Sequence, residues 1–440
     1  MVHTFMTAPY GGTNLGRENS MKTRSQLSIP VLLLLLGAGC ADETLVAPER
    51  DVTESSAVVA GEGGVRTLQG EIGHHARYAL FAPESWNGRL ILYSHGYRDP
   101  GTPVDLRDQD NFYTLRDQLI EDGYAIGYSS YSENGFAVKD GMQRTGQLRG
   151  IFAEHFGEPT RTLLMGNSLG GLIALGLAER FPQQYDGALV MCGIAGGSAA
   201  EINYIANIRV LFDFFYPAAL PGNLLSMPEG TRPQEDIEAP ATAAMTATLA
   251  TGNPQSMQGA FAIAALMEGL GTPIPYIQTL GTPTTIQTLV GSIVYALSFH
   301  ARGFEDLIDR THGHSPFDNS QTVYTGALPP ELLAAVNASP GEGGVQRFST
   351  TRRAGIYLRN YYAPTGKLEI PLVTLNNPFD PISPRFHMED YREEATEAGR
   401  ADLLSERTSA NPFAYGHCAM TVDDTMNAFA ALEAQVALAE

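Results

Sequence analysis

Short apolar runs alternate with helix-like stretches in the first half of the chain. Runs of strand length occur at Arg66–Ile72, Arg77–Pro83, Arg89–Ser94, Tyr124–Ser130, Arg161–Met165 and Gly187–Cys192. Apolar residues have helical spacing in Leu115–Glu121, Gly141–Phe156 and Leu169–Phe181. The first two runs resemble a hairpin, and the later alternation predicts an α/β protein with a doubly wound, mostly parallel sheet.

The alternation stops near residue 196 and resumes near residue 366. The intervening residues are rich in Ala, Met, Thr, Pro and Gly, and helices are expected at Ala239–Ala250, Ala260–Leu270 and Thr285–His300. Strands are then expected at Leu368–Leu375 and Asp402–Arg407, and helices at Arg385–Gly399 and Asp423–Leu438. The pattern therefore predicts a large helical insertion, residues 196–365, between two late strands of one sheet.

The N-terminus has the features of an export signal. A basic start at Met21–Arg24 precedes an apolar core at Ile29–Leu36 that is too short to span a bilayer. Gly37-Ala38-Gly39-Cys40 then resembles the lipobox of bacterial lipoproteins, which implies lipidation of Cys40, although Gly37 stands where leucine is usual. The alternative is ordinary signal cleavage with Cys40 lost or free. We expect a signal peptide over residues 1–40, with the true start at Met21, and a flexible linker over residues 41–65.

Charge restricts the partners of the protein. The 440 residues carry a formal net charge of −20. Such an acidic chain is a poor partner for nucleic acid or for an anionic membrane surface. We therefore expect membrane contact only through a lipid anchor, and a localisation in the cell envelope or periplasm, or at the cell surface.

A serine stands in a glycine-rich turn between a predicted strand and a predicted helix. The turn reads Gly166-Asn167-Ser168-Leu169-Gly170. A strand that reverses directly into a helix strains the residue at the tip, and side chains at the two flanking glycines would collide with the neighbouring elements. The turn would thus hold the serine hydroxyl at the carboxyl end of the sheet, beside the N–H groups of a helix N-terminus. The alternative is a turn that only packs a helix on a sheet.

With this turn, the chain resembles the α/β-hydrolase fold superfamily. The resemblance covers residues 66–195 and 366–440, which we take as the two parts of a hydrolase core, and it is absent from the insertion. It implies a catalytic triad in the chain order Ser, acid, His. It also implies that the insertion before the acid-bearing strand is a helical cap, or lid, over the serine.

Two residues that follow Ser168 match the remaining triad positions of the superfamily. Asp380 comes just after the strand in TLNNPFDPISP, and an Asp-Pro turn there resembles the acid loop. Asp318 is a rival, but it lies in the insertion and no strand precedes it. His417 in PFAYGHCAMT follows Asp380 by 37 residues and resembles the histidine loop. The other candidates lie at less suitable positions: His74, His75, His300, His312, His314 and His387.

The superfamily pattern also implies the remaining parts of the site. His95-Gly96 after a strand matches the oxyanion loop, so the backbone N–H groups of Tyr97 and Leu169 are the expected oxyanion donors.

His312 and His314 lack a nearby third ligand, so we expect no metal, and the triad chemistry needs no cofactor. The loops that hold Cys192 and Cys418 lie close together in such a fold. A disulfide and two buried thiols both remain open.

The position of Cys418 next to His417 partly resembles the arrangement in tannase-type esterases. However, Asn167 precedes Ser168 where those enzymes have a cysteine. The cap suggests a hydrophobic or aromatic substrate, with a pocket wall that includes Phe212, Phe214, Phe215 and Tyr216 or with these residues in the cap's own core. We expect a secreted or lipid-anchored serine hydrolase that cleaves small carboxylic esters through an acyl-enzyme. The alternatives are a peptidase or amidase with the same triad, and a non-catalytic binding protein on this scaffold.

Overall fold

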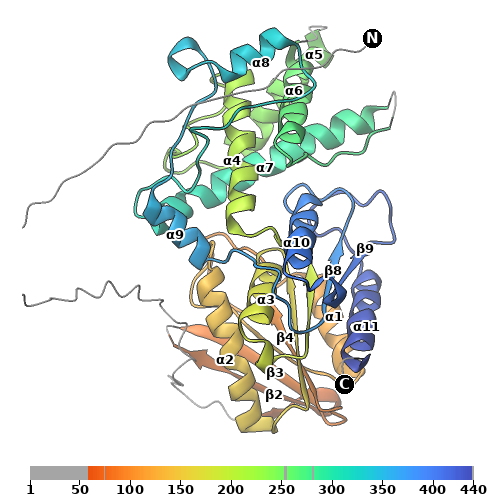
Figure 1. Ribbon diagram of the computed structural model, residues 1–440. Helices are drawn as coiled ribbons and strands as arrows, with labels where there is room; N and C mark the ends of the chain where they lie inside the picture. Colours follow the sequence, from red (N-terminus) through yellow and green to blue (C-terminus); the bar gives the residue numbers. More distant parts are fainter. Residues whose placement is uncertain (1–57, 74, 252–254, 280–281, 439–440) are drawn as a thin grey trace, which may run out of the picture. The chain divides into compact units, whose positions relative to one another are not determined.

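The computed structural model describes residues 58–438, except residue 74 and the segments 252–254 and 280–281. Within these residues, one nine-stranded sheet has the order β1-β2-β3-β5-β4-β6-β7-β8-β9 (Figure 1). The strands are β1 Val59–Ala60, β2 Val65–Ile72, β3 Ala76–Pro83, β4 Arg89–Ser94, β5 Ala125–Ser129, β6 Arg161–Asn167, β7 Gly187–Met191, β8 Leu372–Asn376 and β9 Leu404–Thr408. The expected signal peptide, Cys40 and most of the expected linker lie outside the described residues.

The sheet has an antiparallel edge and a parallel remainder. Strands β1, β2 and β3 pair antiparallel, and β3 also pairs antiparallel with β5. The other six strands, β5-β4-β6-β7-β8-β9, run parallel. Parallel strands need crossovers, which here are helices, so the carboxyl ends of these strands share one edge of the sheet.

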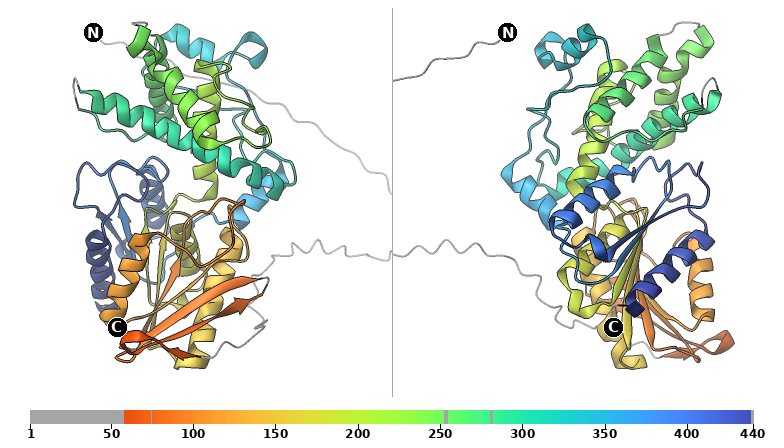
Figure 2. Two further views of the ribbon diagram at one scale, coloured as in Figure 1. Left: turned by 180° about the vertical axis from the view of Figure 1, so that it is seen from behind. Right: turned by 45° about the vertical axis from the view of Figure 1, so that its right-hand side comes forward.

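Helices cover both faces of the sheet. One face carries α2 (Val138–Phe156) and α3 (Leu169–Arg180), and the other carries α1 (Asp110–Glu121) and α11 (Val422–Leu438) (Figures 1 and 2). Helix α10 (Phe386–Glu397) belongs to the α3 side. Ten of the twelve α3 residues are buried, because this helix lies between the sheet and its neighbours. The expected α/β-hydrolase architecture is thus confirmed.

Between β7 and β8, helices form a second layer beyond the carboxyl edge of the sheet. They are α4 Ser198–Phe215, the π-helix Pro233–Glu238, α5 Ala239–Thr251, α6 Gln255–Gly269, α7 Pro283–Arg310, α8 Pro330–Asn337 and α9 Arg352–Asn360. We call this set of helices the cap. One apolar cluster runs from Leu172 in α3 to Phe212 in α4 and Leu297 in α7. The cap and the sheet therefore share a continuous hydrophobic core.

Polar contacts also attach the cap to the sheet domain. Asp306 in α7 accepts a hydrogen bond from the Phe136 N–H at 2.9 Å and pairs with Arg310 at 2.8 Å. Arg310 also reaches Glu133 at 2.7 Å. These contacts fix the C-terminal part of α7 to the loop before α2.

The structure differs from the sequence prediction at several boundaries. Val59 and Ala60, expected in the linker, pair with β2 as an edge strand. A tight turn at Gly63 and Gly64, both with positive φ, connects them to β2. Helix α4 was not predicted, because twelve of its eighteen residues are buried and its sequence shows no clear amphipathic period. Helix α7 continues past its predicted end at His300 as far as Arg310. Among the described residues, no helix is long and apolar enough to cross a membrane.

Candidate active site

Ser168 occupies a strained turn between β6 and α3. Its backbone has φ 54° and ψ −123°, a conformation that costs on the order of 1–3 kcal/mol for a residue with a side chain. A Cβ on Gly166 would lie 2.1 Å from the Gly170 carbonyl oxygen, and a Cβ on Gly170 would lie 2.0 Å from the Ser94 carbonyl oxygen. Both flanking positions therefore require glycine, as the sequence predicts.

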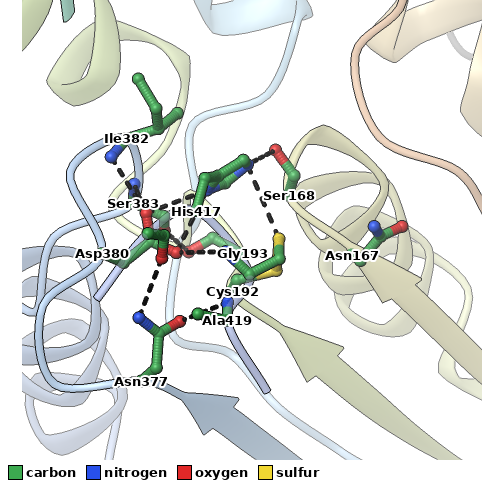
Figure 3. The surroundings of a disulfide bond; sticks show 12 residues. Asn167, Ser168, Cys192, Gly193, Asn377, Asp380, Ile382, Ser383, His417 and Ala419 are labelled. Atoms are coloured by element: carbon green, nitrogen blue, oxygen red, sulfur yellow. Dashed lines mark hydrogen bonds and ion pairs between the residues drawn. A yellow bond between two sulfur atoms is a disulfide. The ribbon is translucent and has the colours of Figure 1, made fainter. Parts of the chain in front are cut away.

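The structure brings Ser168, His417 and Asp380 into one hydrogen-bonded chain (Figure 3). The Ser168 Oγ lies 2.8 Å from the His417 Nε2. The His417 Nδ1 lies 2.9 Å and 3.1 Å from the two Asp380 oxygens. An ionised carboxylate can only accept, so Nδ1 carries the proton and Nε2 is free to accept from the serine hydroxyl.

Asp380 is held by backbone donors as well as by the histidine. Its Oδ1 accepts from the N–H groups of Ile382 at 3.0 Å and Ser383 at 2.9 Å, and its Oδ2 accepts from the Cys418 N–H at 2.9 Å. The residue is almost fully buried. Three backbone donors therefore fix the orientation of this buried carboxylate.

The surroundings of His417 favour its protonated form. Burial acts to lower the His417 pKa, but the charge and hydrogen bond of Asp380, and then the charge of Glu201, outweigh it. The net pKa is raised above the usual 6.5. An imidazole of this kind is a strong base toward the serine proton and a stable imidazolium once it has taken that proton.

The Cys192 and Cys418 sulfurs form a disulfide, which settles the alternative left open by the sequence. The bond joins the residue after β7 to the residue after His417. Asn377 supports the same loop, since its side chain donates to the Gly416 carbonyl at 3.0 Å and accepts from the Ala419 N–H at 3.1 Å (Figure 3). Sequence reasoning missed Asn377, because a lone asparagine after a strand carries no distinctive pattern.

The expected oxyanion loop lies against the serine. A Cβ on Gly96 would stand 3.3 Å from the Ser168 Cβ. The His95 ring stacks on Tyr131 at 3.9 Å and contacts the Gly96 carbonyl at 2.7 Å through Nδ1. Burial lowers the His95 pKa to about 3, so this histidine stays neutral and acts as a structural support of the loop.

Tyr97 and Leu169 both lie near the serine. Tyr97 and Ser168 line one cavity of about 300 Å³, together with His417. Leu169 is the first residue of α3, so its N–H has no acceptor within the helix. That these two N–H groups bind an oxyanion stays a prediction.

The cavity beside the serine continues under α7. An adjoining cavity of about 790 Å³ is lined by His417, Tyr415 and Ile382 of the sheet domain and by residues of α7 that include Val294, Tyr295 and Phe299. The two cavities share Tyr97, Arg98, Phe299 and His417. Phe212, Phe214, Phe215 and Tyr216 line neither of them. Phe212 and Tyr216 belong to the shared hydrophobic core, and Phe214 and Phe215 pack against it, so the structure favours the alternative that these residues form the core of the cap.

The rejected triad candidates have other surroundings. His300 is fully buried, contacts the Leu224 carbonyl through Nε2 at 2.9 Å, and has a pKa lowered by burial to about 3. His312 and His314 lie just after α7, and Asp318 accepts hydrogen bonds from the backbone N–H groups of Ser320 and Thr350. His75 is exposed, and residue 74 is outside the described residues.

His387 forms a buried pair with a residue that the sequence analysis did not single out. The His387 Nε2 lies 2.9 Å from Glu201 in the first turn of α4, and its Nδ1 accepts from the Gly196 N–H at 3.2 Å. Burial raises the Glu201 pKa, and His387 acts against this rise. The pair joins the start of the cap to the helix after the acid loop, and only the fold brings it together.

One group of side chains in the described residues has the spacing of metal ligands. It consists of Cys192, Asp380 and Cys418. Because its two sulfurs are bonded to each other, neither is a free thiolate that could ligate a metal.

Comparison with known proteins gives distant structural neighbours. No protein-family model and no curated protein matches the chain. Among solved structures, it is similar to a bacterial membrane phospholipase A described as a virulence factor, with 17% identity over 86% of this chain and 88% of that chain and a TM-score of 0.36. It is also similar to the rice cell wall degrading esterase LipA from Xanthomonas oryzae, with 14% identity over 84% of this chain and 88% of that chain and a TM-score of 0.34.

Feruloyl esterase B from Aspergillus oryzae has 12% identity over 85% of this chain and 80% of that chain, with a TM-score of 0.44. Likenesses this remote carry no argument about activity. The assignment to the α/β-hydrolase fold rests on the strand order and on the Ser168 turn at the carboxyl edge of the sheet.

Proposed function

We propose that this protein is a serine hydrolase that cleaves carboxylic esters. The observation that carries the proposal is the chain of hydrogen bonds from Ser168 through His417 to Asp380, with 2.8 Å from Oγ to Nε2 and 2.9 Å from Nδ1 to Oδ1. A nucleophile, a base and an orienting acid in this order are the requirements for attack on a carbonyl carbon at neutral pH.

The first half-reaction would transfer the acyl group to the enzyme. Ser168 Oγ bonds to the ester carbonyl carbon while its proton moves to His417 Nε2, and Asp380 stabilises the imidazolium. The oxyanion of the tetrahedral intermediate would accept from the N–H groups of Tyr97 and Leu169. When the intermediate collapses, the C–O bond to the alcohol breaks and His417 gives its proton to the leaving alkoxide.

Water would complete the cycle. His417 takes a proton from a water molecule, whose oxygen bonds to the acyl carbon. The second tetrahedral intermediate then releases the carboxylic acid, and Ser168 Oγ regains its proton from His417. The apolar residues of α7 beside the triad support a hydrophobic substrate, because they offer apolar surface to its acyl group.

A fluorophosphonate probe tests the proposal. We expect covalent labelling of the wild-type protein at Ser168, no labelling of Ser168→Ala, and hydrolysis of p-nitrophenyl butyrate by the wild type only. Gly150→Ala is a matched control, since Gly150 is exposed in α2 and a Cβ added there would meet nothing within 4 Å. A folded wild-type protein that neither labels nor hydrolyses esters would favour the binding-protein alternative. Hydrolysis of p-nitroanilides at a greater kcat/KM than the matching esters would favour an amidase.

We further propose that the protein is exported and anchored through a lipid on Cys40. The Cys192–Cys418 disulfide supports export, because disulfides persist in oxidising compartments. Metabolic labelling with an alkyne fatty acid should mark the wild type and not Cys40→Ser. Equal labelling of both proteins would contradict the anchor and leave the hydrolase proposal intact.

A further inference from the structure

We call the cavity of about 790 Å³ that His417 lines the catalytic cavity. A third cavity, which we call the α7 groove, adjoins it under the cap. It has a volume of about 1030 Å³ and lies between the N-terminal half of α7 and residues of α5, α6 and the segment before α7. Gln287, Gly291 and Val294 line both the α7 groove and the 790 Å³ cavity that contains His417. One side of a single helix thus connects the triad with the groove.

The lining of the α7 groove is free of charge. All fourteen residues that line it are uncharged, although the chain as a whole has a net charge of −20. Its apolar side chains include Phe261, Tyr276, Ile286, Val290 and Val294. By contrast, the catalytic cavity carries Arg98, Asp99, Glu238 and Arg302 on its lining. Charged side chains therefore line the cavity that contains His417, and none lines the adjoining α7 groove.

Large apolar groups remain accessible along this path. Phe261 in the groove is 41% exposed, and Tyr295 in the catalytic cavity is 45% exposed. Exposed apolar side chains gathered in a concave surface are typical of sites for apolar ligands. The two cavities together exceed the 300–1,000 Å³ or so of an ordinary small-molecule pocket.

The groove is fixed to the catalytic loop by a close contact. Tyr415, two residues before His417, donates from its hydroxyl to the Thr288 carbonyl of α7 at 3.2 Å. A Cβ on Gly291 would lie 2.3 Å from the Tyr415 hydroxyl oxygen. Glycine at this position lets the histidine loop lie directly against α7, so the groove starts beside the triad.

We propose that the α7 groove binds a long, unbranched alkyl chain of the ester's acyl group; this inference rests on the proposed function. The path from Val294 to Ile286 covers eight residues of helix, or about 12 Å at 1.5 Å per residue. A short or compact aromatic acyl group would fill the catalytic cavity alone. Five threonines and two glutamines also line the groove, but apolar atoms form most of its exposed surface, which disfavours a peptide or a sugar.

A chain-length series tests this inference. We expect kcat/KM for p-nitrophenyl esters to rise at least tenfold from butyrate to dodecanoate, because each additional buried methylene favours binding by about fourfold. The esters are used below the concentrations at which they form micelles. A wild-type kcat/KM that is flat or falls with chain length overturns the long-chain inference, whereas hydrolysis of butyrate together with fluorophosphonate labelling keeps the proposed function.

Two tryptophan substitutions locate the chain in the groove. Val294→Trp, near the triad, should lower kcat/KM for dodecanoate and octanoate at least tenfold. Ile286→Trp, at the far end of the groove, should lower kcat/KM for dodecanoate at least fivefold. Its kcat/KM for octanoate should stay within twofold of the wild-type value. Butyrate should change by less than threefold in Ile286→Trp, because Ile286 does not line the cavity that contains His417. The control is Glu305→Trp, an exposed position of α7 that lines neither cavity.

Each variant is checked for folding by its melting temperature and by its rate of fluorophosphonate labelling. Variants that label like the wild type but show the same chain-length preference as the wild type overturn the inference. If a tryptophan variant does not fold, Ile286→Ala and Val294→Ala provide a second test. They enlarge the groove, and an unchanged ratio of dodecanoate to butyrate kcat/KM in both contradicts the proposal.

Discussion

The Asp380 carboxylate accepts a hydrogen bond from the backbone N–H of Cys418 at 2.9 Å, in addition to the bond from His417. The acid thus contacts two successive residues of the histidine loop. It orients the imidazole directly, and it also fixes the backbone that carries the imidazole.

Asp380→Asn should lower kcat by roughly ten-thousandfold, the loss that this change causes in another Ser-His-Asp triad. An amide presents an N–H where His417 Nδ1–H needs an acceptor, so the favoured tautomer changes. Single-turnover kinetics with p-nitrophenyl butyrate would measure the loss. A decrease of less than tenfold, with the variant folded, would show that Asp380 is not the triad acid.

The pH dependence of catalysis follows from the raised pKa of His417. The base must be neutral to accept the Ser168 proton, so kcat/KM should rise with pH and level off above a pKa greater than 6.5. Burial alone would lower this pKa, and the negative charges of Asp380 and Glu201 raise it. Glu201→Gln should therefore move the midpoint of the kcat/KM profile to lower pH.

The Glu201→Gln variant retains an oxygen that can accept from His387, so its fold should persist. Glu305→Gln is the matched control, because Glu305 is exposed on α7 and lines none of the three cavities. Equal midpoints in the wild type and Glu201→Gln would show that Glu201 has no electrostatic effect on the triad.

Removal of the disulfide should weaken both stability and activity. Loss of a native disulfide costs about 2–5 kcal/mol in small secreted domains. Cys192→Ala with Cys418→Ala should therefore lower the melting temperature, and release of the loop beside His417 should reduce kcat more than it raises KM. The same double variant in the presence of a reductant is the control, since it should show no further change. A melting temperature equal to that of the wild type would refute the stabilising role.

Gly170→Ala should abolish ester hydrolysis. Its new methyl group would lie 2.0 Å from the Ser94 carbonyl oxygen, a backbone atom that cannot move without displacing β4. Gly150→Ala, in the open part of α2, should instead gain up to about 1 kcal/mol from helix propensity. Fluorophosphonate labelling and thermal melting of both variants compare the two outcomes. Normal labelling of Gly170→Ala would contradict the close packing of the turn.

Local patterns in the sequence were sufficient to predict most of the sheet and the strained turn at Ser168. That turn combines the end of a strand, a strained tip and two required glycines within five residues. Asp380 and His417 follow from the superfamily's chain order, which the strand order of the structure now supports. Only the structure shows the hydrogen bonds that join Asp380 to His417 and His417 to Ser168.

The helices of the cap were harder to predict from the sequence. Most residues of helix α4 are buried, and no clear polar face marks its helical period. The side chains that line the catalytic cavity come from α7, and the sequence pattern gave no sign of which cap helix would meet His417. The Glu201–His387 pair joins residues 186 positions apart, and no local pattern connects them.

The disulfide also determines what a proteolytic cut would do. Cys192 precedes the cap and Cys418 follows it, so the bond closes a covalent ring that contains the cap, Asp380 and His417. A nick anywhere in the cap would leave the two fragments linked, and they would separate on a gel only after reduction. Ser168 lies outside the ring, yet the bond would still hold it beside its two partners after the chain between them has been severed.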